Sequence, residues 1–132
     1  MIPDDSTVRR PSHGELQGKI LKARGKIAAG DWLAASFEKL LPEFEELDLW
    51  TEEERNRALE MAADEVEPEH YAGQRPPQRS YEDACKGAEL FAFAWHSRHY
   101  GRQMYLKFCF VKETLYIVSF HEDRRGEKEV RE

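Results

Sequence analysis

Apolar and polar residues alternate most regularly between residues 103 and 121, where the pattern predicts two β-strands. Both arms are rich in aromatic and β-branched residues, which favour strands. The one short polar cluster, residues 112–114, lies where a turn is needed. We therefore predict a β-hairpin with a three-residue loop, in which Val111 faces Leu115.

The two faces of this hairpin differ in character, because side chains alternate between them. The first face is apolar throughout and is predicted to be core, with the pairs Phe110–Tyr116, Phe108–Val118 and Leu106–Phe120. The second face is apolar near the turn and polar at the open end, with the pairs Val111–Leu115, Cys109–Ile117, Lys107–Ser119 and Tyr105–His121. A tyrosine, a lysine, a serine and a histidine should therefore meet at one end of one face.

Helical periodicity dominates the first half of the chain. Ser12 and Glu15 have capping-box spacing, which predicts a first helix from there to about Gly30. Its buried face should hold Leu16, Ile20, Ala23 and Ile27, and another face carries Lys19, Lys22 and Lys26. That lysine stripe is either an ordinary solvated face or a contact surface for a phosphate backbone or an acidic partner.

Two further helices follow. The second is predicted from near Asp31 until Pro42 interrupts it. The third should be capped by Thr51 and Glu54 and end before Pro68, with an acidic exposed face.

The region between the helices and the hairpin holds a loop and a further strand. Residues 68–81 show no period, and are either functional or disordered. The loop residues suited to phosphate are His70, Tyr71, Gln74, Arg75 and Arg79. Small and large residues alternate over 88–95, which predicts a strand that flanks the hairpin at an internal position in the sheet. The turn at 96–102 has Gly101 available for a positive φ.

These elements predict an α+β fold, with N-terminal helices on one face of a three- to four-stranded antiparallel sheet. The length of 132 residues suits one domain over residues 12–125. A flexible N-terminal arm over 1–11 and a charged tail over 126–132 complete the predicted organisation.

Charge is distributed unevenly along the chain. The net charge is -6, and thirteen of the 26 acids fall between residues 38 and 69. Residues 90–112 contain no carboxylate, and hold the cations and histidines His96, Arg98, His99, Arg102, Lys107 and Lys112. The net charge argues against a general nucleic-acid binder, but the basic region coincides with the polar end of the hairpin.

The sequence also indicates the cellular compartment and whether metal or cofactor sites are expected. No apolar run is long enough to span a bilayer and the N-terminus lacks an apolar leader, so we expect a cytoplasmic protein without membrane contact. Cys85 and Cys109 are expected to be reduced structural thiols. His96 and His99 lack the second ligand pair of a zinc site, so neither a metal nor another cofactor is expected.

RNA cleavage without a metal needs a base for the 2′-hydroxyl, an acid for the leaving 5′-oxygen and cations around the phosphate. His121 can exchange a proton near neutral pH, Tyr105 can donate or orient, and Lys107, Arg98 and Arg102 can stabilise the phosphate. The alternative is that Tyr105 and His121 form only a cross-strand packing pair.

The hairpin residues also carry a family resemblance. Met104-Tyr-Leu-Lys-Phe, followed by Leu115-Tyr-Ile-Val-Ser-Phe-His-Glu, resembles the C-terminal hairpin of the MqsR toxins, small ribonucleases related to RelE. Element order extends the resemblance to about residues 15–122. It implies an mRNA-cleaving toxin of a type II toxin–antitoxin pair, with a cognate antitoxin and mRNA as partners.

Carried over residue by residue, the resemblance places the family's catalytic tyrosine on Tyr105 and one of its lysines on His121. Two other functional positions of the family fall on Ala72 and Ala92, for which Arg75 and Gln74 could substitute from the loop. These departures leave a non-catalytic protein-binding module of the same fold as the alternative. A third alternative is a small regulatory protein that forms a homodimer through Trp and Phe surfaces.

Overall fold

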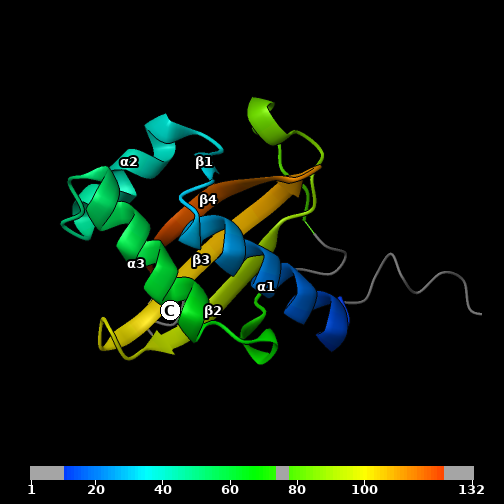
Figure 1. The fold of residues 1–132 in the computed structure, drawn as a ribbon, viewed down its shortest axis with the longest axis horizontal. Helices are drawn as coiled ribbons and strands as arrows, with labels where there is room; N and C mark the ends of the chain where they lie inside the picture. Colours follow the sequence, from blue (N-terminus) through cyan, green and yellow to red (C-terminus); the bar gives the residue numbers. More distant parts are fainter. Residues whose placement is uncertain (1–10, 74–77, 124–132) are drawn as a thin grey trace, which may run out of the picture.

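The computed structural model describes residues 11–73 and 78–123 (Figure 1). Its helices are α1 (His13–Ala28), α2 (Phe37–Glu46) and α3 (Glu52–Glu65), with short 3₁₀ turns η2 (Pro68–His70) and η3 (Asp83–Cys85). Its strands are β1 (Leu33–Ala34), β2 (Phe91–Ser97), β3 (Arg102–Val111) and β4 (Thr114–Glu122), in the sheet order β1-β4-β3-β2. The predicted α+β class is confirmed, but the sheet is mixed, because β1 runs parallel to β4.

The first helix forms as its sequence predicts. The Ser12 side chain accepts a hydrogen bond from the Glu15 backbone N–H at 3.1 Å, and this cap begins α1. The four residues of the predicted apolar face, Leu16, Ile20, Ala23 and Ile27, are all buried. Gly30 adopts a φ of +68° directly after the helix, which ends it and turns the chain.

The predicted second helix was wrong at both ends. The chain is extended after Gly30, and Leu33–Ala34 pairs with Tyr116–Ile117 of β4. The helix α2 begins only at Phe37 and continues through Pro42 to Glu46. The pairing of β1 with a strand far along the sequence overrides the local helical pattern.

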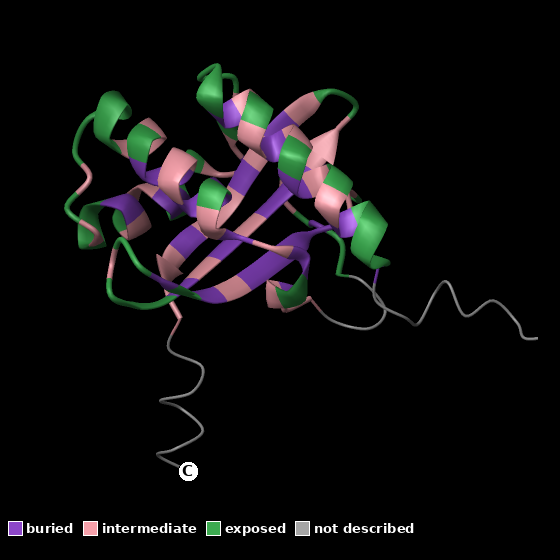
Figure 2. Cartoon of the chain, turned by 60° about the horizontal axis from the view of Figure 1, so that its bottom comes forward, coloured by how far each residue is buried: buried purple, intermediate pink, exposed green. Residues whose placement is uncertain are grey.

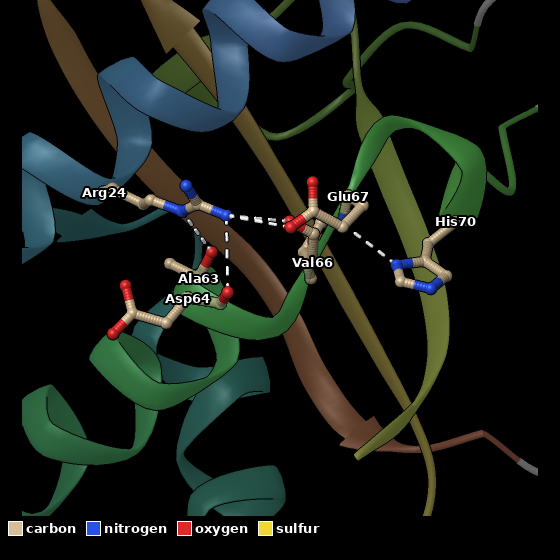
Figure 3. A network of polar contacts seen from close by, with 6 residues as sticks. All are labelled: Arg24, Ala63, Asp64, Val66, Glu67 and His70. Carbon is tan, nitrogen blue, oxygen red and sulfur yellow. Dashed lines mark hydrogen bonds and ion pairs between the residues drawn. The ribbon is translucent and has the colours of Figure 1, made fainter. Parts of the chain in front are cut away.

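One arginine ties the first helix to the third (Figure 3). The Arg24 guanidinium donates to the backbone carbonyls of Ala63, Asp64 and Val66 at 2.6, 3.3 and 3.0 Å. These carbonyls lie at the C-terminal end of α3, where no further turn of helix satisfies them. The N-terminal end of α3 carries the predicted capping box of Thr51 and Glu54.

The hairpin forms, but its turn is shorter than predicted. Its loop is Lys112–Glu113, and Val111 pairs with Thr114 rather than with Leu115. Lys112 adopts a φ of +57°, as two-residue hairpin turns require of their first residue. In the half next to the turn, the pairs are therefore Phe110–Leu115, Cys109–Tyr116 and Phe108–Ile117.

A β-bulge separates this half from the open half of the hairpin. The register shifts between Lys107 and Phe108, which leaves Val118 as the extra residue on β4. Beyond the bulge the predicted register is confirmed, with the pairs Lys107–Ser119, Leu106–Phe120 and Tyr105–His121. The predicted faces of β4 were therefore wrong near the turn. Leu115 and Ile117 lie in the main core, and Tyr116 and Val118 pack on the other side of the sheet.

Two apolar clusters lie on opposite faces of the sheet. The main core joins the buried sides of the three helices to one face of β2, β3 and β4, and Figure 2 shows buried residues along the strands and exposed residues on the outer sides of the helices. The smaller cluster contains Ala35, Cys85, Leu90 and Cys109 near the hairpin turn. Both cysteines are free and buried, and burial raises the pKa of the Cys109 thiol.

The flanking strand β2 lies at the edge of the sheet, not at the predicted internal position. Its outer side is partly covered, because Tyr71 forms a bridge with Phe93 and the Ala72 N–H donates to the Ala92 carbonyl at 2.7 Å. Most residues of the predicted N-terminal arm and C-terminal tail lie outside the described residues.

Candidate functional site

The three residues predicted to be catalytic lie together at the open end of the hairpin. The ring of His121 stacks on the ring of Tyr105, with centroids 5.1 Å apart and planes at 23°. The Lys107 ammonium lies 5.9 Å from the centre of the same tyrosine ring. Because Leu106 and Phe120 point into the main core, their neighbours Tyr105, Lys107 and His121 lie on the opposite face, away from α1 and α3.

The imidazole of His121 has a defined tautomer. Its Nδ1 atom lies 2.7 Å from the backbone carbonyl oxygen of Glu122, and a carbonyl can only accept a hydrogen bond. Nδ1 is therefore the donor, and Nε2 carries the lone pair when the ring is neutral. The Nε2 atom is the one that can accept a proton from a substrate.

A carboxylate from α2 completes this arrangement. Glu43, on α2, accepts a hydrogen bond at 2.8 Å from the backbone N–H of Phe120, next to His121. Burial raises the pKa of the Glu43 carboxyl, while the Phe120 N–H and the positive charges of His121 and Lys107 oppose that rise. Burial also lowers the pKa of the Lys107 ammonium, and Glu43 opposes that shift.

We call Glu43, Tyr105, Lys107, Ser119 and His121 the open-end cluster. All five are partly exposed. Sequence patterns gave no signal for Glu43, because it stands in an acidic stretch that resembles an ordinary solvated surface. The half-buried side chains of Lys107 and Glu43 place opposite charges beside His121. An acid–base site has this combination of residues.

Two alanines of β2 lie beside the open-end cluster. Ala92 of β2 pairs with Lys107, and Ala94 pairs with Tyr105. Both alanines lie on the same sheet face as the open-end cluster. Their methyl groups are much shorter than the side chains of Lys107 and Tyr105 beside them. His96, which pairs with Gln103, extends this face toward the β2–β3 turn.

The predicted phosphate-binding arginines lie at that turn. Glu65 of α3 anchors it by accepting hydrogen bonds from the backbone N–H groups of Arg98 and His99, at 2.9 and 3.2 Å. The Arg98 side chain is exposed, whereas Arg102 forms an ion pair with Glu122 at 3.3 Å. Arg98 is therefore more readily available to a phosphate than Arg102, whose guanidinium already pairs with Glu122. Gln74 and Arg75, the other predicted phosphate ligands, lie outside the described residues.

The described part of the 68–81 loop has structural contacts. His70 Nδ1 accepts from the Glu67 backbone N–H at 2.9 Å, Tyr71 is largely buried, and Arg79 donates to the Gly87 carbonyl at 2.9 Å. These contacts are made within the loop, with the residue before it, or with the segment that leads into β2. The loop therefore supports the edge of β2 where it is described.

The lysine stripe of α1 also packs on the protein. Lys19 lies 5.5 Å from the centres of the Phe91 and Phe110 rings, and Lys22 lies 4.7 Å from that of Phe110. Lys22 also pairs with Glu113 at the hairpin turn, at 3.3 Å. Lys19 and Lys22 thus cover aromatic surface near the turn, at the other end of the hairpin from the open-end cluster, and Lys26 pairs with Asp31 at 3.4 Å.

Comparison of the chain with family models, curated proteins and solved structures gave no match. Residues 11–73 and 78–123 contain no group of three or more His, Cys, Asp or Glu residues that could hold a metal ion. No helix in those ranges combines the length and the apolar character needed to cross a bilayer.

Proposed function

We propose that this chain is a metal-independent endoribonuclease, an mRNA-cleaving toxin of a type II toxin–antitoxin pair, with its catalytic site at the open-end cluster. One observation supports the ribonuclease proposal above the others. His121, with Nε2 available, stacks on Tyr105 beside the Lys107 ammonium, on the sheet face away from α1 and α3. The toxin assignment rests on the resemblance of the hairpin sequence to the MqsR toxins.

The proposed reaction is an internal attack within the RNA. Nε2 of His121 takes the proton of a 2′-hydroxyl, and the 2′-oxygen forms a bond to the adjacent phosphorus. The bond from phosphorus to the 5′-oxygen breaks, and the Tyr105 hydroxyl donates a proton to that oxygen. The products are a 2′,3′-cyclic phosphate and a free 5′-hydroxyl, and water returns the proton from the imidazolium to the phenolate.

Lys107 and Glu43 have electrostatic roles in this proposal. A half-buried ammonium is less screened than an exposed one, so Lys107 can stabilise the charge that grows on the phosphate oxygens. Glu43 holds the strand segment that bears His121 through the hydrogen bond from Phe120. We assign Glu43 as a positioning residue, and Tyr105, Lys107 and His121 as catalytic residues.

The test is cleavage of a defined RNA by the purified full chain in the presence of EDTA, with the products analysed for a 2′,3′-cyclic phosphate. His121→Ala should lower the cleavage rate by about 10²–10⁴-fold, as expected for loss of a general acid or base. His96→Ala is the matched control, because His96 is exposed on the same sheet face two strand positions from the cluster. It should cleave within about threefold of the wild-type rate.

Expression in cells provides a second readout. The wild-type chain should stop growth, and His121→Ala should relieve the arrest while the protein remains folded by circular dichroism. His121→Lys, which restores the residue of the family, should keep a charge but lose proton transfer near neutral pH. A folded wild-type protein that cleaves no RNA and is tolerated by cells would overturn the proposal.

A non-catalytic protein-binding module is the second candidate. The observation that favours it is the pair Ala72 and Ala92, which stand where the resemblance places functional residues and are joined by a backbone hydrogen bond. Without functional side chains at these two positions, the open-end cluster can keep its packing but lose catalytic activity. Absence of cleavage together with a stable protein complex would support this candidate.

A further inference from the structure

A groove of about 600 Å³ lies away from the open-end cluster, between β1 and the helices α2 and α3. Its volume is within the range of ligand and peptide sites. The residues that line it come from the connection between α1 and β1, from β1, and from α2 and α3, and include Trp32, Leu33, Phe37, Phe44, Arg55 and Glu60. The strand β1, which forms part of the groove, is the outermost strand of the sheet.

The apolar part of this groove is unusually exposed. Leu33 and Phe37 are 55% and 54% exposed, although large apolar side chains gain free energy from burial. Below them, Phe44 is fully buried and Trp32 donates to the Asn56 side chain at 2.7 Å. Phe44 and Trp32 therefore form a fixed base of the groove, while the side chains of Leu33 and Phe37 remain exposed to solvent.

The charged part of the groove is acidic at its rim. Glu52, Glu53 and Glu60 line it together with Arg55 and Arg57, and the Asn56 side chain donates to Glu60 at 3.4 Å. The ion pairs formed by the described residues involve none of the three glutamates. Carboxylates remain in excess, because residues 38–69 hold thirteen acids against Lys39, Arg55 and Arg57. Arg55 is already engaged, since its Nε donates to the Leu49 carbonyl at 3.1 Å and its guanidinium lies 5.3 Å from the Phe44 ring centre.

Helix capping explains only part of this acidity. Glu52 and Glu53 stand in the first turn of α3, where negative charge stabilises a helix by a few tenths of a kcal/mol up to about 1 kcal/mol. Glu60 stands two turns later, beyond the reach of that effect. The excess of acids over cations in residues 38–69, together with exposed Leu33 and Phe37, fits a ligand that is both apolar and basic.

We propose that this groove is a docking site for a basic, apolar segment of a partner protein. An aliphatic or aromatic side chain of that segment packs between Leu33 and Phe37, and flanking lysine or arginine residues face Glu53 and Glu60. A second copy of this chain fits less well, because its net charge is -6 and half of its acids fall between residues 38 and 69, where this rim lies. The site is independent of the proposed ribonuclease activity.

The test uses the full chain and three short fluorescein-labelled peptides. The first contains leucines among lysines and serines, the second has glutamates in place of the lysines, and the third has serines in place of the leucines. Fluorescence anisotropy should show saturable binding of the first peptide, and the second and third should bind at least about tenfold more weakly. Added salt should weaken binding of the first peptide, because the carboxylate contacts are exposed.

Matched variants locate the binding. Leu33→Ser with Phe37→Ser should weaken binding of the first peptide by about tenfold or more. Leu21→Ser is the control, since Leu21 is 52% exposed on α1 and does not line the groove. Glu53→Gln with Glu60→Gln should reduce both the affinity and its salt dependence, whereas Glu69→Gln should change neither.

Three results would overturn the proposal. One is absence of saturable binding of the first peptide, and another is equal binding of all three peptides. The third is concentration-dependent dimerisation in sedimentation velocity that Leu33→Ser with Phe37→Ser abolishes, which would assign the groove to self-association. RNA cleavage by these variants, measured in parallel, should stay at the wild-type level whether or not the groove binds a partner.

Discussion

The carboxylate of Glu43 accepts a hydrogen bond at 2.8 Å from the backbone N–H of Phe120, 77 residues further along the chain. The strand β1 covers the outer edge of β4 only at Tyr116 and Ile117, so beyond it the backbone of β4 needs another partner. Glu43 supplies that partner from α2. The same contact brings a carboxylate beside the strand segment that carries His121.

Glu43→Gln should change how the stability of the protein depends on pH. The raised pKa of Glu43 means that the folded state binds more protons than the unfolded state, so wild-type stability falls as pH rises from about 4.3 through the raised value. Glutamine keeps an acceptor for Phe120 and does not titrate. Urea unfolding over this window should give a flatter pH profile for the variant, and identical profiles would contradict the assignment.

Lys107→Met should stabilise the protein and abolish RNA cleavage. Burial lowers the pKa of Lys107, so the ammonium is less favourable folded than unfolded, and wild-type stability should rise as pH increases through the lowered value toward about 10.4. The gain at neutral pH should be at most about 1 kcal/mol, because the side chain is half exposed. Urea unfolding and RNA cleavage measured on the same preparation check both effects, and a variant that is destabilised yet active would refute this view of Lys107.

Lys112→Gly should raise the free energy of unfolding by about 0.5–1 kcal/mol. Lys112 adopts a positive φ in the hairpin turn, which costs a residue with a Cβ about 1–2 kcal/mol, and the entropy that glycine loses on folding offsets part of the gain. Glu113→Gly is the matched control, because Glu113 is not among the residues with positive φ and should lose stability. Thermal unfolding of both variants, compared with wild type, distinguishes these outcomes.

Arg98→Ala should weaken RNA binding more than Arg102→Ala. Arg98 is exposed, while Arg102 already pairs with Glu122 and would have to give up that contact. Each phosphate contact contributes about one counterion to the salt dependence, so Arg98→Ala should reduce the slope of log affinity against log salt by about 1. Titrations of an uncleavable RNA at several salt concentrations measure this. Affinity that does not respond to salt would exclude phosphate contacts altogether.

Local signals predicted the parts of the fold that local interactions decide. The Ser12 and Thr51 caps and the buried faces of α1 and α3 follow from residue types within one or two turns. The two-residue strand β1 is too short to show a period, and it forms only because β4 lies beside it. Glu43 was missed for the same reason, since its role depends on a strand near the other end of the chain.

The hairpin shows a different limit. Near the turn both faces of β4 are apolar, so a shift by one residue exchanges one apolar set for another and the pattern cannot choose between them. At the open end the predicted pair of Tyr105 with His121 is confirmed, because the turn is one residue shorter than predicted and the bulge adds one residue back on β4.

The bulge at Val118 separates two halves of the hairpin that have different registers. The core pair Leu106–Phe120 holds the open half, and the turn holds the other half. Insertion or deletion of one residue near the turn can be absorbed by movement of the bulge, so that His121 stays opposite Tyr105. Homologues that vary the length of the turn are therefore expected to keep the tyrosine and its partner in register, and natural variation should collect on the turn side of the bulge.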